Sequence, residues 1–344
     1  MKIIINPGGN IEYKSFYIIG LERMFGRANI SYSSLPFLDL PSAVRNDKDM
    51  LFVTEHAGKQ RRYFISCNDF YKINDAAWQW ADVYGSVNVN WEKTDKKYWS
   101  KMVSLCPSFG VKCYSLPRAA YHALLNYRAG NGTLRHCLGR HRHMTTRLEY
   151  ENYVQKRESQ YDPNYLFFLS TLWNSDEWNR NDEGVNLTRV HYIRAAKHVM
   201  QDMGGVFEGG FASLGSERSS EQLFADCLYH SVPMNEWFEK TQQSALVFNT
   251  PAFWNCHGWK LGEYMAMGAC VLSTPLSNDL PAPLLHGEHI HIVENSQEAM
   301  EDAIRYILTH PEYNMKLRTN LRAYWQKYGT PEASLTLLGV KEYA

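Results

Sequence analysis

Short apolar runs bounded by polar or turn residues recur along the first half of this chain of 344 residues. Runs of this length are typical of buried strands in a parallel sheet. The pattern predicts strands at residues 2–6, 30–35, 50–54, 63–66 and 83–90. Between them, the spacing of apolar positions predicts helices at residues 13–25, 76–82 and 149–159. Strands that alternate with helices in this way indicate an α/β fold.

The second half repeats this alternation after a break at Asp162-Pro163, because the residue before a proline disfavours helix. Strands are predicted at residues 165–172, 205–211, 244–249, 270–273 and 289–293. Helices are predicted at residues 188–202, 222–230, 234–244, 260–267, 296–308 and 311–328. A chain of this length can hold two domains. We expect them at residues 1–160 and 161–325, with residues 326–344 as a C-terminal tail.

The stretch from residue 245 to 275 is the most informative part of the sequence. It reads as a strand, a loop that contains Pro251 and Gly258, a short helix and a second strand. Gly268 falls just beyond the helix, at the left-handed position that glycine adopts without steric cost. Such a unit belongs to a parallel α/β sheet, in which ligands bind beyond the carboxyl ends of the strands.

Two charged residues stand near the start of this short helix. Glu263 is predicted in its first turn, where the helix dipole stabilises a carboxylate. The same carboxylate can accept hydrogen bonds from a diol, such as the ribose of a nucleotide. Lys260, one turn earlier, can meet a phosphate. The residues alone leave open whether Glu263 stabilises the helix or binds a ligand.

This stretch resembles the donor-binding segment of bacterial GT-B glycosyltransferases, through Gly258, Lys260, Glu263, Tyr264, Met265, Ala266, Gly268 and the strand Val271-Leu272. The resemblance implies two Rossmann-like domains with parallel sheets that face each other across a cleft. The first would bind the acceptor, and the second would bind a nucleotide-sugar donor with Glu263 on its ribose. The tail would pack back toward the first domain. Large retaining families carry another glutamate eight positions before this one, where the chain has Asn255, with His257 nearby.

The function that the resemblance implies is transfer of a sugar from a nucleotide diphosphate sugar to a hydroxyl of a saccharide or lipid-linked saccharide, in bacterial surface polysaccharide synthesis. GT-B sites stabilise the departing diphosphate with helix N-termini and basic side chains. No metal, and no cofactor besides the donor, is therefore expected. Lys260 is the first candidate for that charge, while Asn255, His257 and Gly258 would line the pocket. A nucleotide-sugar epimerase of the same fold and a non-catalytic nucleotide- or sugar-binding protein are the alternatives.

Two glycine pairs are further candidates for donor binding. Gly8-Gly9 follows the first predicted strand, and Gly209-Gly210 lies near the end of a strand in the second half. Glycines let the backbone approach a ligand closely, and bare N–H groups at a helix start favour anions. Both pairs are equally compatible with plain turns.

Three polar residues, two near strand ends and one at the start of a predicted helix, complete the candidate site. Thr171 ends the most apolar strand, whose exit points into the cleft in GT-B proteins. Arg189 is a second candidate for the cation that neutralises the diphosphate. Asp69 is the candidate catalytic base for an inverting reaction. Turn and helix-cap chemistry is the alternative for Asp69, since it follows Asn68 at a strand end.

Net charge is zero, so the total gives no support for nucleic-acid binding. Four arginines and three histidines nevertheless gather at residues 131–147. Three interpretations remain open for this cluster. It can hold a metal, bind an anion such as a phosphate-bearing lipid acceptor or the membrane surface, or form a solvated loop or inter-domain surface.

The remaining sequence features concern location. Seven cysteines are scattered without a Cys-x-x-Cys pair, which indicates reduced thiols in a cytosolic protein. The first apolar run is too short for a signal peptide, and no stretch approaches the ~20 apolar residues that a membrane-spanning helix needs. We expect a cytoplasmic protein, at most in peripheral contact with the inner face of the membrane.

Overall fold

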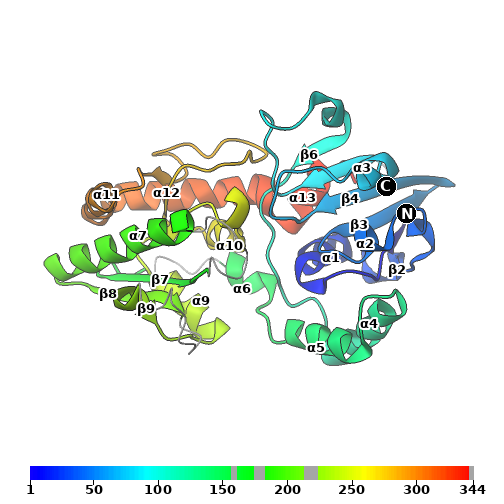
Figure 1. Cartoon of the computed structure of the whole chain (residues 1–344), viewed down its shortest axis with the longest axis horizontal. Coiled ribbons are helices and arrows are strands. Elements are labelled where there is room, and N and C mark those ends of the chain that lie inside the picture. The colour runs from blue at the N-terminus through cyan, green and yellow to red at the C-terminus, as the bar shows by residue number, and fades with distance from the viewer. Residues whose placement is uncertain (156–160, 174–182, 213–223, 341–344) are drawn as a thin grey trace.

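A computed structural model describes residues 1–155, 161–173, 183–212 and 224–340 of the chain. These residues form two α/β halves that lie side by side, one from each half of the sequence (Figure 1). The predicted fold class, two Rossmann-like halves with sheets rich in parallel pairs, is confirmed. This arrangement is that of the GT-B fold.

The N-terminal half is built on a sheet of six strands in the order β2-β1-β3-β4-β5-β6. The strands are β1 (Lys2–Ile5), β2 (Ile30–Tyr32), β3 (Met50–His56), β4 (Lys59–Ser66), β5 (Val83–Ser86) and β6 (Met102–Ser104).

The prediction that all these strands are parallel is wrong for β3, which pairs antiparallel with both β1 and β4. Only Ala57 and Gly58 separate β3 from β4, and both have positive φ, 50° and 75°. A two-residue turn of this kind joins only antiparallel strands.

The first half of the chain also contains helices. They are α1 (Ile11–Phe25), α2 (Ser42–Arg45), α3 (Asp75–Trp80), α4 (Leu116–Arg128), α5 (Leu134–Met144) and α6 (Tyr150–Val154). The charge cluster at residues 131–147 is thus mostly the helix α5 rather than a loop. The helix predicted at residues 149–159 is shorter than expected, since α6 ends at Val154 and residues 156–160 lie outside the described residues.

The C-terminal half contains two groups of three parallel strands, in the orders β7-β8-β9 and β10-β11-β12. They are β7 (Tyr165–Thr171), β8 (Val206–Ala212), β9 (Leu228–Tyr229), β10 (Val247–Asn249), β11 (Val271–Ser273) and β12 (His291–Ile292). The Ala245 N–H donates to the Tyr165 carbonyl at 2.9 Å, which places β10 beside β7. The carboxyl ends of β7 and β10 therefore open at one edge.

The helices of this half are α7 (Glu183–Asp202), α9 (Met234–Gln243), α10 (Trp259–Met267), α11 (Gln297–Thr309) and α12 (Pro311–Tyr324). The helix predicted at residues 222–230 is wrong in its described part, where a short 3-10 turn at Ala225–Cys227 leads into β9. Leu228 and Tyr229 instead pair in parallel with the end of β8.

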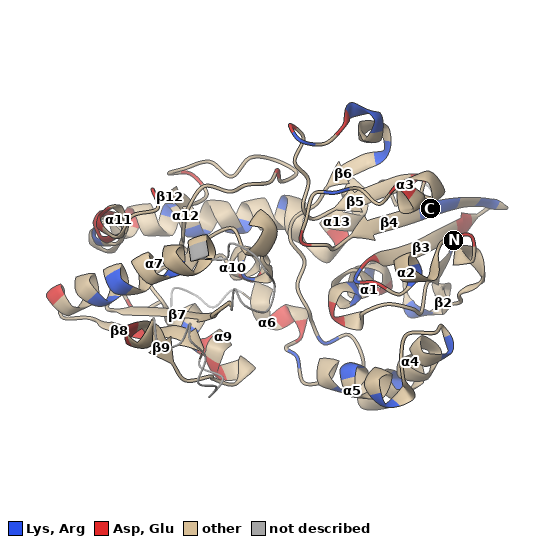
Figure 2. Ribbon diagram, in the orientation of Figure 1, with Lys and Arg blue, Asp and Glu red and all other residues tan. Residues whose placement is uncertain are grey.

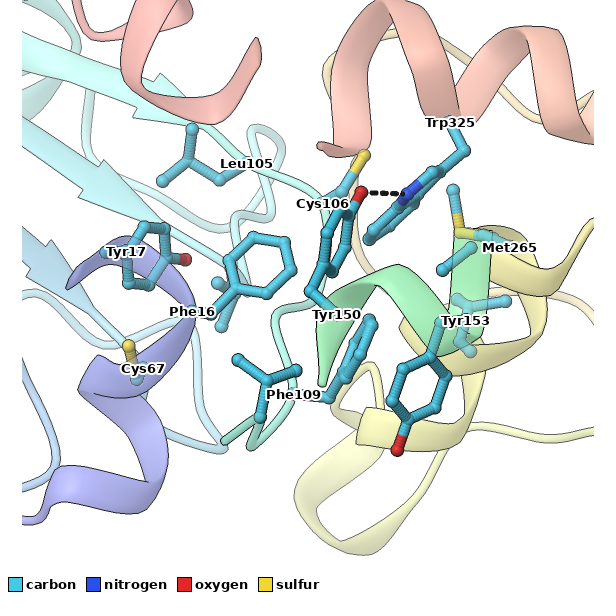
Figure 3. Packing of buried hydrophobic residues seen from close by; sticks show 14 of the residues in the cluster. Phe16, Tyr17, Cys67, Leu105, Cys106, Phe109, Tyr150, Tyr153, Met265 and Trp325 are labelled. Carbon is cyan, nitrogen blue, oxygen red and sulfur yellow. Dashed lines mark hydrogen bonds between the residues drawn. The ribbon is translucent and has the colours of Figure 1, made fainter. Parts of the chain in front are cut away.

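A buried aromatic cluster joins the two halves (Figure 3). Phe16 of α1 and Phe109 lie against Tyr150, and the Trp325 indole N–H donates to the Tyr150 hydroxyl at 2.9 Å. Beyond Trp325 the chain reaches α13 (Pro331–Leu337), which packs against α1 of the N-terminal half (Figure 1). The division at residues 160 and 161, with residues 326–344 as a tail, stays a prediction.

Candidate functional site

The segment from β10 to β11 folds as its sequence predicts. α10 begins after Gly258, whose backbone is extended. Because glycine has no side chain, no side chain of this residue caps the first N–H groups of the helix. Gly268 ends α10 in the left-handed conformation, with φ 62° and ψ 44°. The free N–H groups at the start of α10 are a natural anion site, because they carry the positive end of the helix dipole.

A cavity of about 160 Å³ opens at this helix start. Its walls come from the carboxyl ends of β7 and β10, the first turn of α10 and the side of α7. Polar lining residues are Ser170, Thr171, Arg189, Asn249, Thr250 and Lys260, and the others include Trp173, Gly258 and Trp259. The structure therefore brings together four residues that the sequence nominated, namely Thr171, Arg189, Gly258 and Lys260.

Two cations meet in this cavity. Arg189 is only 8 % exposed, and one of its guanidinium N–H groups donates to the Thr171 carbonyl at 2.9 Å. The Lys260 ammonium donates to the Leu169 carbonyl and lies 5.2 Å from the centre of the Phe168 ring. Within the described part of the chain, neither side chain forms an ion pair with a carboxylate. Two positive charges that form no ion pair make an environment that attracts an anion.

Burial shifts the pKa values of both cations. It lowers the pKa of Lys260 to about 7, and the nearby Arg189 charge lowers it further in the same direction. Burial also lowers the pKa of Arg189 to about 10, so this guanidinium stays charged at neutral pH. A bound anion would reverse these shifts, because an opposite charge favours the protonated form of each group.

Glu263 occupies a different place from the predicted one. It lies in the second turn of α10, not the first, since the helix already begins at Trp259. Its side chain is 5 % exposed, is not among the lining residues of the cavity and accepts a hydrogen bond of 3.4 Å from the Tyr153 hydroxyl of α6. Burial raises the pKa of Glu263 to about 7, against the opposing charges of Arg147 and Lys260. Ribose binding by Glu263 stays a prediction.

Asn255 and His257 lie on the loop before α10, at the boundary between the two halves. The His257 N–H donates to the side-chain oxygen of Asn88 at 2.8 Å, and Asn278 donates both to that oxygen and to the Asn255 carbonyl, each at 3.0 Å. Neither Asn255 nor His257 lines the cavity. Their contact with the donor therefore stays a prediction.

His257 is buried and remains neutral, because burial lowers its pKa to about 4. Among the described residues, no hydrogen-bond partner faces its Nε2 atom.

Asn88 is a residue that the sequence interpretation missed. It follows β5 in the N-terminal half, is 2 % exposed, and bonds to loops on both sides of the boundary. The available signal was the alternation of Val87, Asn88, Val89 and Asn90, which carries two amides at a strand exit.

The glycine pairs have structural tasks. Gly8 and Gly9 are enclosed by the chain, since their carbonyls accept hydrogen bonds from Lys14 and Asn126. Gly209 and Gly210 lie within β8 with φ 124° and 150°, and a Cβ on Gly209 would lie 1.8 Å from the Phe168 carbonyl oxygen. Neither pair lines the cavity at α10, and donor contact by these glycines stays a prediction.

Asp69 lies at the boundary between the halves. Its carboxylate accepts a hydrogen bond of 2.8 Å from the Lys48 ammonium, and the Cys256 sulfur lies 4.0 Å from its other oxygen. The alternative interpretation of Asp69 as a helix cap is wrong, because Asn74 caps the next helix. The role of Asp69 as a catalytic base stays a prediction.

Three further observations concern metal binding, the helices and the cysteines. Among the described residues, no group of three or more histidine, cysteine or acidic side chains is arranged to hold a metal ion. None of the described helices combines the length and apolar character that crossing a membrane requires. All seven cysteines are buried and unpaired.

Comparison with protein-family models finds no match, and no curated protein matches the chain. Solved structures do match it. A putative UDP-N-acetylglucosamine 2-epimerase from Listeria monocytogenes aligns over 99% of this chain and 96% of its own, with 9% identity and a TM-score of 0.48. Anabaena Alr3699/HepE in complex with UDP-glucose aligns over 78% and 66%, with 10% identity and a TM-score of 0.43.

TarM aligns over 53% of this chain and only 36% of its own length, with 13% identity and a TM-score of 0.37. This chain thus spans about a third of the length of TarM.

Proposed function

We propose that this protein is a glycosyltransferase that moves a hexosyl group from a nucleotide diphosphate sugar to a saccharide hydroxyl. The observation that carries the proposal is the cavity at the start of α10, where the buried Arg189 and the partly buried Lys260 form no ion pair with a carboxylate in the described part of the chain. A diphosphate matches this site in charge, and the resemblance of the α10 sequence to donor-binding segments agrees with it.

The chemistry follows from that charge. As the acceptor oxygen forms a bond to C1 of the donor sugar, the bond from C1 to the diphosphate oxygen breaks, and negative charge grows on the diphosphate. The α10 N–H groups, Lys260 and Arg189 would stabilise that charge without a metal. The acceptor hydroxyl loses its proton in the same step. Asp69, at the boundary of the halves, is the proposed base for an inverting reaction.

The alternatives share the cavity but differ in what they need. A nucleotide-sugar epimerase would change the donor with no acceptor present. A non-catalytic binding protein would retain the donor unchanged. Release of nucleoside diphosphate over many turnovers, only when a saccharide is added, distinguishes the transferase from both.

A thermal-shift screen tests the diphosphate site directly. We expect UDP or GDP to raise the melting temperature by roughly 4 °C when present at about 100 times the dissociation constant. The matching nucleosides, which lack phosphate, should leave it unchanged. If none of the common nucleoside diphosphates or their sugars shifts the melting temperature, the proposal fails.

A lipid-linked acceptor is the form of substrate that we propose, and a surface on α4 and α5 supports it. Residues 116–144, which span α4 and α5, contain no aspartate or glutamate, and several arginines lie along α5 (Figure 2). Large apolar side chains are exposed on the same two helices, namely Leu116, Tyr121, Tyr127, Leu134 and Leu138. A protein surface that combines basic and apolar groups favours binding to an anionic membrane.

Sedimentation with phosphatidylglycerol vesicles tests this surface. The double variant Arg135→Gln/Arg142→Gln should bind roughly 30-fold more weakly, because each basic residue near an anionic surface contributes about 1 kcal/mol. The matched control Lys96→Gln/Lys97→Gln removes two exposed charges from another part of the same half and should bind as the unchanged protein does. Equal binding by all three proteins would contradict the membrane assignment.

A further inference from the structure

A row of four aromatic rings runs from the donor cavity to the N-terminal half. Trp173, which lines the cavity, lies 5.5 Å from Phe253 between ring centres, Phe253 lies 5.4 Å from Trp254, and Trp254 lies 5.5 Å from Phe70. The first three belong to the C-terminal half and Phe70 to the N-terminal half. The row therefore ends beside Asp69, the residue that precedes Phe70.

The backbone presents Trp254 to the surface under strain. Trp254 and Asn255 both have φ of 59°, a left-handed conformation that asparagine tolerates but that a bulky residue such as tryptophan avoids. Hydrogen bonds hold the loop in this shape, from the Ala252 N–H to the Cys256 carbonyl at 2.9 Å and from Asn278 to the Asn255 carbonyl. Trp254 is 44 % exposed and Phe70 is 38 % exposed, so both rings are accessible at the surface.

A polar pair accompanies the exposed rings. Asp69 and Lys48 are joined at 2.8 Å, and both side chains are about one third exposed, at 37% and 33%. A second path leads from this pair to the cavity, since Lys48 lies 5.2 Å from the Tyr13 ring and Tyr13 lies 5.0 Å from Trp259. Trp259 also lines the cavity. The Asp69–Lys48 pair and the aromatic row therefore both lie beside the loop that contains Trp254 and Asn255, next to the cavity proposed for the donor.

We propose that Trp254 and Phe70, with Asp69 and Lys48, form the acceptor subsite and take a pyranose ring of a saccharide. This inference rests on the proposed function and names the site of its second substrate. A pyranose has an apolar C–H face that packs on an aromatic ring, and hydroxyls at its edge that pair with a carboxylate and an ammonium group. The carboxylate of Asp69 then lies where an acceptor hydroxyl must lose its proton.

Saturation-transfer NMR with the methyl pyranosides of glucose, galactose, mannose and N-acetylglucosamine tests the subsite, in the presence of UDP or GDP. The variant Trp254→Asn removes the ring and retains the backbone, because asparagine tolerates positive φ. We expect transfer to the ring protons of at least one glycoside, with affinity about tenfold lower in Trp254→Asn. Phe70→Ala should weaken binding in the same direction. The control Trp99→Ala, which removes a tryptophan that is 40 % exposed, should have no effect.

Three results would overturn the inference. Equal glycoside transfer in the unchanged protein and in Trp254→Asn would place the saccharide elsewhere, and absence of transfer from every glycoside would count equally against it. Loss of UDP or GDP binding in Trp254→Asn would assign the rings to the nucleobase of the donor instead. The proposed function fails separately, if the unchanged protein binds no nucleoside diphosphate; glycoside binding that depends on Trp254 would then still support the saccharide subsite.

Discussion

Replacing Lys260 with methionine should lower the turnover number at least about 100-fold, the typical effect of removing one group that stabilises transition-state charge. Methionine fills similar space in the cavity but removes the charge. Because negative charge on the diphosphate grows as the bond to C1 breaks, the lysine contributes more to the transition state than to the bound donor. Nucleoside diphosphate affinity should therefore fall less, by about tenfold, the effect of one charge-assisted hydrogen bond.

Release of nucleoside diphosphate measures turnover, and calorimetry measures affinity. Lys316→Met is the matched control, since Lys316 is a surface lysine paired with Glu288, and it should change neither quantity. Equal losses of turnover and affinity in Lys260→Met would reduce the lysine to a binding residue. Unchanged turnover would show that Lys260 takes no part in the reaction.

Nucleoside diphosphate binding should take up a proton above pH 7. In the empty protein the pKa of Lys260 is lowered to about 7, so at pH 8 most molecules carry a neutral lysine. A bound diphosphate raises this pKa again, because an adjacent negative charge favours the ammonium form. Binding must then add a proton, and affinity should fall by up to about tenfold for each pH unit above 7.

Calorimetry at pH 8 in two buffers of different ionisation enthalpy measures the uptake. We expect close to one proton per bound diphosphate, and none in Lys260→Met. Arg189 should contribute little at this pH, because its pKa, lowered to about 10, leaves it charged before and after binding. Heats that do not depend on the buffer would show that Lys260 is already protonated or does not face the ligand.

The fold and part of the site could be predicted from local sequence. Strands, helices and the Gly268 helix end depend on the spacing of apolar residues and on the conformational freedom of glycine, which neighbours along the chain decide. Lys260 could be nominated because ligands bind where strand exits and helix starts converge at one edge of a parallel sheet. Thr171 and Gly258 were nominated through the resemblance to GT-B proteins. The sequence by itself thus determined two α/β halves and the short helix α10.

Tertiary structure decided which of the nominated residues meet. Arg189 joins Lys260 from a different helix, and no local pattern records that contact. Glu263 follows Lys260 by three residues but faces Tyr153 instead of the cavity, because α6 covers that side of α10. Long-range packing also enclosed Gly8 and placed Gly209 inside a strand. Side-chain direction and pairing depend on segments far apart in the sequence, so only the folded chain specifies them.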